Sequence, residues 1–252
     1  MPINKIVSSF DEAISDIRDG ATVMIGYFGG PGEPPCWLIR ALARRGTRDI
    51  TLIGNMTGWG RTLIPVFAQK MKDFIRYPSW WDDPGLLVEN GQIKRAICSW
   101  ASGMTPSNVN DFEKRFRAKE VELEMVPQGT LAERIRAGKA NIAAFYVPTG
   151  AGTVVEEGKE VRVFNGKKYI LEHALRADFA LIHAHKADRW GNLIYQGTSR
   201  TFNATMAGAA AVTIAEVDEI VELGELDPET IVTPGIYVDR VVVRPIDEVR
   251  RW

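Results

Sequence analysis

Short apolar runs alternate with helical patterns along most of this chain. The apolar runs lie at residues 22–25, 50–53, 96–98, 121–126, 142–147 and 179–182. The segments predicted as helices lie at residues 9–20, 37–43, 110–118 and 130–138. Runs this short are typical of buried strands, and their alternation with helices is typical of a mostly parallel sheet covered on both faces. We therefore expect an α/β fold with one mostly parallel open sheet and helices on both faces.

One departure from this alternation predicts a β-hairpin in the second half of the chain. Residues 161–164 and 168–171 lie on either side of Asn165-Gly166. An Asn-Gly pair supplies the positive φ angles that a tight hairpin turn requires. No internal repeat or Pro/Ser-rich linker interrupts the 252 residues, and single α/β domains of this length are common. The expectation is one domain over residues 1–252, with a β-hairpin excursion.

Composition excludes several classes of function. The 31 Lys and Arg residues balance 32 Asp and Glu residues, whereas nucleic acid and anionic membranes require a basic excess. The longest nearly apolar stretch, residues 206–214, is far shorter than the roughly 20 residues that span a bilayer. The first residues contain no apolar run of signal-peptide length, and Cys36 and Cys98 cannot make a disulfide framework. We expect a cytoplasmic protein that binds neither nucleic acid nor a membrane.

A loop rich in glycine and proline, residues 26–35, follows the first predicted strand. Such a turn between a strand and a helix lets the backbone approach a ligand and directs free N–H groups at anions. Its spacing does not match the G-x-G-x-x-G of dinucleotide-binding proteins, and no Lys-Ser or Lys-Thr pair completes a P-loop. On spacing alone, a ligand-binding loop and a tight structural turn are equally well supported.

Two further segments carry weaker signals. Thr130 and Glu133 have the spacing of a helix capping box, and Arg134 and Arg136 in the same helix are expected to face solvent rather than bind an anion. A second glycine turn, residues 148–153, follows a predicted strand. It is a candidate wall of a ligand cleft, because ligands bind at the carboxyl ends of strands in open α/β sheets.

No combination of residues completes a catalytic site by itself. His183 and His185 lie two apart, on one face of a strand if the strand extends that far. No carboxylate cluster adjoins them in the sequence, so we predict no metal site. The Gly-x-Ser-x-Gly motif of serine hydrolases is missing, and no Cys–His pair is indicated.

A set of motifs resembles the A-subunit signature of family I CoA-transferases. The signature reads D-G, an apolar strand, and G-G-F-x-x-x-G-x-P, and its matches here are Asp19-Gly20, Gly26-Tyr27-Phe28, Gly32 and Pro34. Tyr27 stands where the family usually has a second glycine. Similar segments cover nearly the whole chain, at residues 126–138, 148–153, 177–193, 199–203, 222–228 and 232–238. The last two look most like A subunits of 3-oxoadipate and acetoacetate CoA-transferases.

The resemblance implies half of an enzyme. In this family the nucleophile is a glutamate of the B subunit, so no catalytic residue is expected in this chain. That glutamate takes CoA from an acyl-CoA such as succinyl-CoA and passes it to a carboxylic acid, here a 3-oxo acid, through a glutamyl-CoA thioester with ping-pong kinetics. Coenzyme A is then a cosubstrate, with no tightly bound cofactor and no metal. The implied assembly is an obligate complex with the B subunit, of the form A2B2.

The resemblance also implies site residues. Asn55 falls where relatives keep an asparagine near the acyl pocket, although a role in capping the strand end is equally consistent with its position. Glu89-Asn90-Gly91 matches part of the catalytic motif of B subunits, but Val88 replaces its serine, so we do not expect Glu89 to be a nucleophile. The residues expected to contact CoA are Gly26, Tyr27, Phe28, Gly29, Gly30, Pro31 and Gly32.

The largest difference from the family lies at about residues 59–84, where relatives have a shorter segment. Exposed aromatic side chains at high density are typical of a contact surface. We therefore expect this insertion to cover the acyl pocket or thicken the subunit interface, and so to alter the choice of acyl group. Its aromatic residues include Trp59, Phe67, Phe74, Tyr77, Trp80 and Trp81.

Two other functions fit the same motifs. One is a CoA-thioester hydrolase or lyase on the same scaffold, and the other is a non-catalytic CoA-binding subunit. A B-type partner would favour either enzyme. Transfer of CoA to an acid would then identify a transferase, whereas release of free CoA alone would identify a hydrolase.

Overall fold

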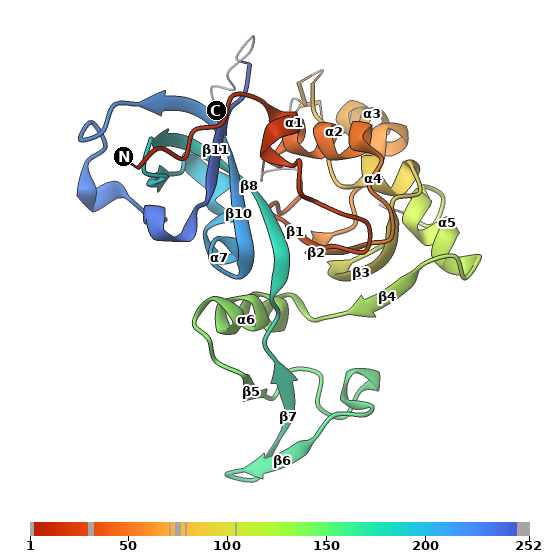
Figure 1. Cartoon of the computed structure of the whole chain (residues 1–252). Coiled ribbons are helices and arrows are strands. Elements are labelled where there is room, and N and C mark those ends of the chain that lie inside the picture. The colour runs from red at the N-terminus through yellow and green to blue at the C-terminus, as the bar shows by residue number, and fades with distance from the viewer. Residues whose placement is uncertain are drawn as a thin grey trace.

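The computed structural model describes residues 3–29, 33–70, 72–73, 77–78, 80–103 and 105–245. Its body is a sheet in the order β11-β10-β8-β1-β2-β3-β4, in which all these strands run parallel (Figure 1). The short β9 pairs antiparallel with β8. Along the chain, β2, β3 and β4 follow one another on one side of the central β1, and β8, β10 and β11 follow later on its other side. The strands are β1 (Thr22–Ile25), β2 (Ile50–Met56), β3 (Ile93–Trp100), β4 (Glu122–Met125), β8 (Ala177–Asp188), β9 (Leu193–Ile194), β10 (Ala210–Val221) and β11 (Arg240–Val243).

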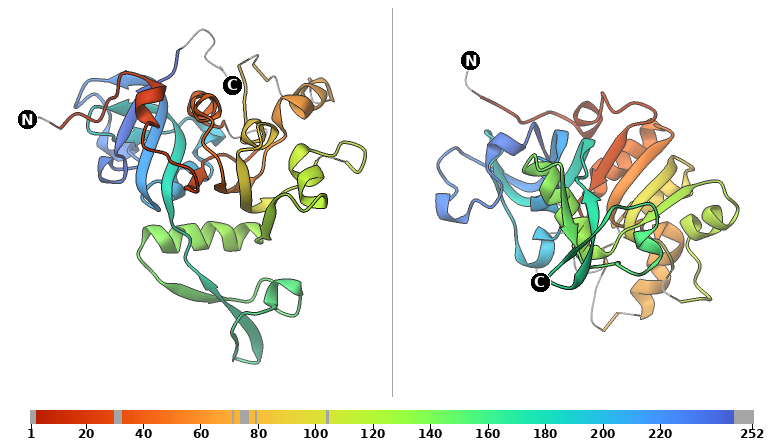
Figure 2. Two further views of the ribbon diagram at one scale, coloured as in Figure 1. Left: turned by 45° about the vertical axis from the view of Figure 1, so that its right-hand side comes forward. Right: turned by 90° about the horizontal axis from the view of Figure 1, so that it is seen from below.

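Helices cover both faces of this sheet, which confirms the predicted fold (Figure 2). Side chains of each strand point alternately into two cores. Val23 and Ile25 belong to the core that includes α1, α2, α4 and α5, whereas Met24 belongs to the core that includes α6 and α7. Both faces of the central strands β1 and β2 are therefore buried, which explains why their sequences are mostly apolar. The helices are α1 (Phe10–Ala13), α2 (Cys36–Arg45), α3 (Gly60–Lys70), α4 (Gly85–Glu89), α5 (Asp111–Arg117), α6 (Gln128–Lys139) and α7 (Asn203–Met206).

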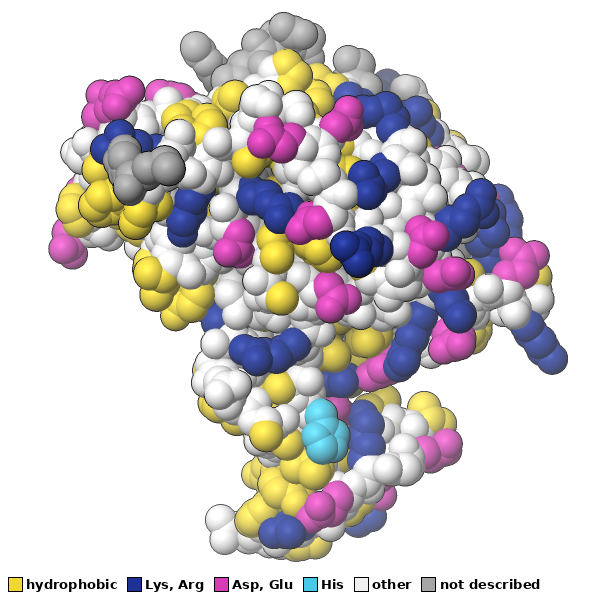
Figure 3. Space-filling model, viewed as in Figure 1, with side chains coloured by type: hydrophobic (Ala, Val, Ile, Leu, Met, Phe, Trp, Pro, Cys, Tyr) yellow, Lys and Arg dark blue, Asp and Glu magenta, His cyan; other side chains and the backbone are white. Residues whose placement is uncertain are grey.

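The predicted hairpin is part of an arm that projects from the body (Figure 1). The arm is an antiparallel sheet in the order β5-β7-β6, with bounds β5 (Ala144–Val147), β6 (Val161–Phe164) and β7 (Lys167–His173). Asn165 and Gly166 have φ angles of 50° and 75°, as the turn requires. Apolar side chains lie on the surface of the arm, including Val154 (79% exposed) and Val163 (62% exposed) (Figure 3). Exposed apolar surface of this kind is typical of protein contacts.

Two helix boundaries differ from the prediction. Ser9 caps the first helix by accepting a hydrogen bond from the Glu12 N–H, but α1 ends at Ala13 rather than at Gly20. In α6 the N-cap residue is Pro127, so Thr130 lies inside the helix and does not cap it. Within the described part of the chain, no helix is long and apolar enough to cross a membrane.

Arg134 is buried, which contradicts its predicted exposure to solvent. Its Nη1 donates to Glu124 Oε1 at 2.6 Å, and its Nε donates to the His173 carbonyl oxygen at 2.8 Å. Because Glu124 is in β4 and His173 is in β7, Arg134 of α6 ties the body to the arm. Arg136 is exposed, as expected, and pairs with Glu133.

Candidate functional site

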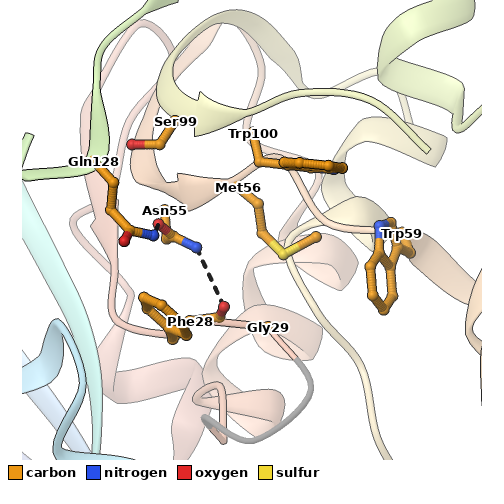
Figure 4. Close-up of a pocket in the computed structure, with 8 residues that line it drawn as sticks. All are labelled: Phe28, Gly29, Asn55, Met56, Trp59, Ser99, Trp100 and Gln128. Carbon is orange, nitrogen blue, oxygen red and sulfur yellow. Dashed lines mark hydrogen bonds between the residues drawn. The ribbon is translucent and has the colours of Figure 1, made fainter. Parts of the chain in front are cut away.

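A cavity of about 400 Å³ opens at the carboxyl ends of β1, β2 and β3. Its lining includes two residues of the loop after β1, the last two residues of β2 and of β3, and the first residue of α6. Parallel strands bring their carboxyl ends to one edge of a sheet, which is where open α/β sheets bind ligands. The lining residues are Phe28, Gly29, Asn55, Met56, Trp59, Ser99, Trp100 and Gln128 (Figure 4).

A chain of hydrogen bonds joins three of these residues. Gln128 Nε2 donates to Asn55 Oδ1 at 2.7 Å, and Asn55 Nδ2 donates to the Phe28 carbonyl oxygen at 3.2 Å (Figure 4). Each amide group keeps a second N–H, and Gln128 keeps its carbonyl oxygen. The free N–H groups can donate to a carbonyl or carboxylate oxygen in the cavity. Asn55 thus faces the cavity and also holds the loop after β1, so both roles considered for it are compatible with its contacts.

Packing explains part of the glycine-rich loop. A Cβ atom at Gly26 would lie 2.0 Å from Oδ1 of Asn203, the first residue of α7, so only glycine fits at position 26. Gly29 has a φ of 105°, a conformation that favours glycine. Phe28 and Gly29 line the cavity, whereas the side chain of Tyr27 is buried in the protein interior. The remaining loop residues of the prediction, Gly30, Pro31 and Gly32, lie outside the described residues.

Tyr27 is held by a buried carboxylate from the 59–84 segment. Its hydroxyl donates to Asp83 at 3.2 Å, and Asp83 also accepts from the backbone N–H groups of Trp59, Gly60 and Gly85 at 2.8–2.9 Å. Burial raises the pKa of Asp83, although these hydrogen bonds favour its charged form. Tyr27, which stands where the family signature usually has a glycine, therefore contacts the aromatic-rich 59–84 segment.

The described aromatic side chains of this segment are buried or half-buried, so the expectation of an exposed aromatic surface is wrong. Phe67 and Trp81 are 9% and 5% exposed. The Trp59 ring packs on Phe67 at a centroid distance of 4.3 Å, and Tyr77 packs on Phe67 and Trp81 at 5.6 and 5.0 Å. Phe74 lies outside the described residues. Trp59 is thus presented to the cavity from a packed aromatic cluster.

A second carboxylate attaches the same segment to α2. The buried Asp82 accepts from Arg61 Nε and Nη2 at 2.8 and 2.9 Å, and it also pairs with Arg40. Arg40 Nη2 donates to the Trp80 carbonyl oxygen at 2.8 Å. Both arginines line a different cavity, of about 290 Å³, rather than the one at the strand ends.

The two histidines belong to a buried ionic network. His183 and His185 lie in β8, and their ring nitrogens lie 2.9 and 3.0 Å from the Asp218 carboxylate of β10. Arg244 contacts Asp218 at 2.6 Å and Glu33 at 2.6 Å. No local pattern indicates these carboxylates beside the histidines, because the sheet brings them together from distant segments. Among the residues that the structure describes, no three His, Cys, Asp or Glu side chains are placed to hold a metal ion.

Glu216, in the same network, carries a strongly perturbed carboxyl group. Its Oε2 accepts from the N–H groups of Trp37 and Leu38 at the start of α2, at 2.9 and 3.0 Å. Desolvation by burial raises the pKa of Glu216 from 4.5 to about 7, against the opposing effects of His183, Arg244 and these hydrogen bonds. Between these pH values the folded chain holds a proton that the unfolded chain releases. The stability from this group is therefore fully present below about pH 4.5 and is lost as the pH rises through 7.

The variant Glu216→Gln cannot ionise and is expected to avoid this loss. Between pH 5 and 8, the wild-type free energy of unfolding should fall by about 3 kcal/mol relative to that of the variant. Urea unfolding of both proteins at several pH values measures this difference. Glu219→Gln, at an exposed position of the same strand, is the control and should show no such trend. A constant difference between wild type and Glu216→Gln across this range would contradict the raised pKa.

Two other candidates lie away from the cavity. Glu89 accepts hydrogen bonds from the N–H groups of Arg61 and Thr62 at the start of α3, at 3.1 and 2.9 Å, so its carboxylate caps a helix. The glycine turn at residues 148–153 lies in the arm and is not among the residues that line the cavity. The prediction that this turn forms a cleft wall is therefore wrong for this cavity.

Sequence reasoning missed Gln128, Ser99 and Trp100 as lining residues. A signal for them was present, because Ser99 and Trp100 follow the predicted strand at 96–98 and Gln128 follows the predicted strand at 121–126. In a parallel sheet these positions share the edge that holds Asn55. Their shared position with Asn55 at the carboxyl ends of the strands, rather than any motif, could have identified Ser99, Trp100 and Gln128 as lining residues.

Comparisons with known proteins agree with this architecture. A family model described as Coenzyme A transferase matches residues 7–244. The A subunit of the 3-oxoadipate CoA-transferase of Pseudomonas putida is 45% identical over 240 residues, covering 95% of this chain and 94% of the relative. The A subunit of the probable succinyl-CoA:3-ketoacid coenzyme A transferase of Bacillus subtilis is 43% identical over 251 residues, covering 98% and 93%.

A solved structure shares the fold at lower sequence identity. The glutaconate coenzyme A-transferase of Acidaminococcus fermentans superposes with a TM-score of 0.76 at 22% identity, covering 96% of this chain and 76% of that chain. The family match spans most of the chain, and both relatives exceed 40% identity over nearly their whole lengths. This chain belongs to the coenzyme A transferase family.

Proposed function

We propose that this chain is the A subunit of a heteromeric CoA-transferase that moves CoA from an acyl-CoA, such as succinyl-CoA, to a 3-oxo acid. The observation that carries the proposal is the hydrogen-bonded pair Asn55 and Gln128 at the carboxyl edge of the sheet. Asn55 binds the acyl group, and the loop from Gly26 to Gly32 contacts CoA. The names of the relatives from Pseudomonas and Bacillus support the subunit type and the class of acid.

The cavity has groups that bind a substrate but no activated nucleophile among its described residues. Only Ser99 among them offers a nucleophilic hydroxyl, and that oxygen is buried without a hydrogen-bond partner, so no base activates it. Asn55 and Gln128 can donate hydrogen bonds to a thioester carbonyl oxygen as negative charge develops on it. These properties support a division of roles in which the nucleophile comes from another chain.

The proposed nucleophile is a glutamate of the B subunit. Its carboxylate attacks the thioester carbonyl carbon, the C–S bond breaks, and CoA leaves as a thiolate. The thiolate then attacks the glutamyl carbonyl carbon of the resulting anhydride, which releases the first acid and leaves a glutamyl-CoA thioester. The acceptor carboxylate takes the CoA by the reverse sequence. The exposed apolar side chains of the arm are consistent with a second chain, which we propose assembles with this one as A2B2.

The purified chain alone is expected to transfer no CoA, because the nucleophile is on its partner. Adding the B subunit should produce acetoacetyl-CoA from succinyl-CoA and acetoacetate, measured by chromatography. Mass spectrometry of the complex treated with succinyl-CoA should find covalently bound CoA on the partner and none on this chain. A partner in which the catalytic glutamate is replaced by alanine is the matched control.

The same experiment separates the alternatives. Release of free CoA without acetoacetyl-CoA would identify a hydrolase. Binding of CoA without turnover in the complex would identify a non-catalytic binding subunit. Robust transfer by the isolated chain would contradict the division of roles.

A further inference from the structure

Arg244 directly follows β11 and connects the sheet to the glycine-rich loop after β1. Its backbone N–H donates to the Val217 carbonyl oxygen of β10 at 2.9 Å, so its main chain continues the pairing of β10 with β11. Its Nη1 donates to Oε1 of Glu33, a residue of the loop, at 2.6 Å. A fixed position of the sheet therefore holds a loop residue that lies 211 positions earlier in the chain.

The ion pair between Arg244 and Glu33 is buried, with side chains only 3% and 7% exposed. His183 Nδ1 lies 3.9 Å from Glu33 Oε2, beyond hydrogen-bond distance. Asp218 also contacts Arg244, but it lies 2.9 and 3.0 Å from ring nitrogens of His183 and His185 as well. Removal of the guanidinium would therefore leave Asp218 with both histidines, whereas the buried Glu33 would lose its donor at 2.6 Å.

Aromatic rings and carboxylates together fix the orientation of the Arg244 guanidinium. Its Cζ lies 5.5 Å from the centroid of the Trp37 ring and 4.9 Å from that of the Trp80 ring. Nη1 and Nη2 each contact a different carboxylate at 2.6 Å. A planar guanidinium makes all of these contacts at once, whereas the ammonium group of lysine lacks the fork that they require.

The other end of the loop forms part of the cavity wall. Phe28 and Gly29 line the cavity, and the Phe28 carbonyl oxygen accepts from Asn55 Nδ2 at 3.2 Å (Figure 4). Glu33 is the second anchor, and only residues 29–32 separate the two. Because glycine restricts the backbone less than any other residue, contacts at the two anchors determine where this wall lies.

We infer that Arg244 is a positioning residue for CoA transfer, which holds the loop after β1 in place to bind acyl-CoA. The inference rests on the proposed function, in which residues 26–32 contact CoA. Arg244 is not among the described residues that line the cavity, so it acts through Glu33. In a ping-pong reaction CoA enters with the acyl-CoA and is already covalently bound when the acceptor acid arrives. A displaced loop should therefore weaken the first half of the reaction and spare the second.

The variant Arg244→Met tests this asymmetry in the reconstituted complex. The value of kcat/KM for succinyl-CoA is expected to fall at least about tenfold, mainly through a higher KM. The value for acetoacetate should stay within about twofold of wild type, because CoA is bound before this acid reacts. General damage to the protein would lower both values by the same factor. Mass spectrometry of the covalent CoA adduct measures the fraction of active complex.

Arg240→Met is the matched control. Arg240 is the first residue of β11 and pairs with Asp16 at the opposite end of the strand, so this substitution should leave both values unchanged. Arg244→Lys retains the charge without the planar fork and should recover only part of the activity with succinyl-CoA.

Glu33→Gln tests the same contact from the side of the loop. It removes the charge of Glu33 and leaves Arg244 in place, so the value for succinyl-CoA should fall by a smaller factor and that for acetoacetate should stay unchanged. If Arg244→Met does not fold, this variant decides the question. The combined variant Glu33→Gln/Arg244→Met should lose less than the product of the two separate losses, because both changes remove one interaction.

The outcomes distinguish the inference from the proposed function. Equal losses for both substrates in Arg244→Met, or no loss for either, would overturn the inference and leave the proposed function intact. Losses that multiply in the combined variant would show that Arg244 does not act through Glu33. The absence of transfer by the wild-type complex would contradict the proposed function, and the inference with it.

Discussion

Replacing Gln128 by leucine is expected to lower kcat/KM for CoA transfer by about a hundredfold, the usual effect of removing one donor to a developing oxyanion. Leucine has nearly the same size, but it cannot donate to the substrate oxygen or to Asn55 Oδ1. Most of the loss should appear in kcat, because the negative charge develops only as the reaction proceeds. Steady-state kinetics of the reconstituted complex measure both constants.

Gln69→Leu provides the matched control for this variant. Gln69 is an exposed residue of α3 that does not line the cavity, so the same substitution there should leave both kinetic constants unchanged. Thermal unfolding of the two variants establishes that each is folded. A Gln128→Leu enzyme with activity within about threefold of wild type would show that the amide is not an oxyanion donor.

Replacing Asp83 by alanine is expected to lower the free energy of unfolding by about 3–5 kcal/mol. The carboxylate is buried and accepts hydrogen bonds from the N–H groups of Trp59, Gly60 and Gly85 and from the Tyr27 hydroxyl. Alanine would leave all of these donors without an acceptor in a region from which water is excluded. Urea unfolding followed by tryptophan fluorescence measures the loss.

Two milder variants calibrate the loss for Asp83→Ala. Tyr27→Phe removes one donor and leaves the carboxylate with its backbone partners, so it should cost only about 1 kcal/mol. Asp11→Ala removes a carboxylate of an exposed ion pair with Arg44 and should cost less than about 1 kcal/mol. A loss in Asp83→Ala no larger than that in Asp11→Ala would refute the structural role given to the buried carboxylate.

The architecture of the sheet could be predicted from the sequence because its cause is local. Strands buried on both faces require continuous apolar runs, and the runs near Val23, Leu52 and Ala180 meet that requirement. The Asn165-Gly166 turn could be predicted for the same reason, because the two residues themselves determine the backbone angles. Features that depend on one segment or one turn were therefore accessible without a structure.

Features that depend on partners distant in the sequence were not accessible in this way. Arg134 has the position of an exposed helix residue, and only the approach of Glu124 and His173 shows that it is buried. The aromatic residues of the 59–84 segment were expected on the surface because nothing in the local sequence shows that they pack on one another. The cavity is also assembled from four separate segments, so the motifs identified Phe28 and Asn55 but not Gln128.

The contacts of Asp82 and Asp83 have a consequence for exchange of sequence between relatives. Both carboxylates lie in the 59–84 segment, but their partners Arg40 and Tyr27 lie in α2 and in the loop after β1. A chimera that replaced only this segment with the shorter one of a relative would leave a buried hydroxyl and a guanidinium without acceptors. The unit that keeps these contacts and the Glu89 cap of α3 together extends from residue 26 to residue 89, and Tyr27 is inherited together with the aromatic segment that it anchors.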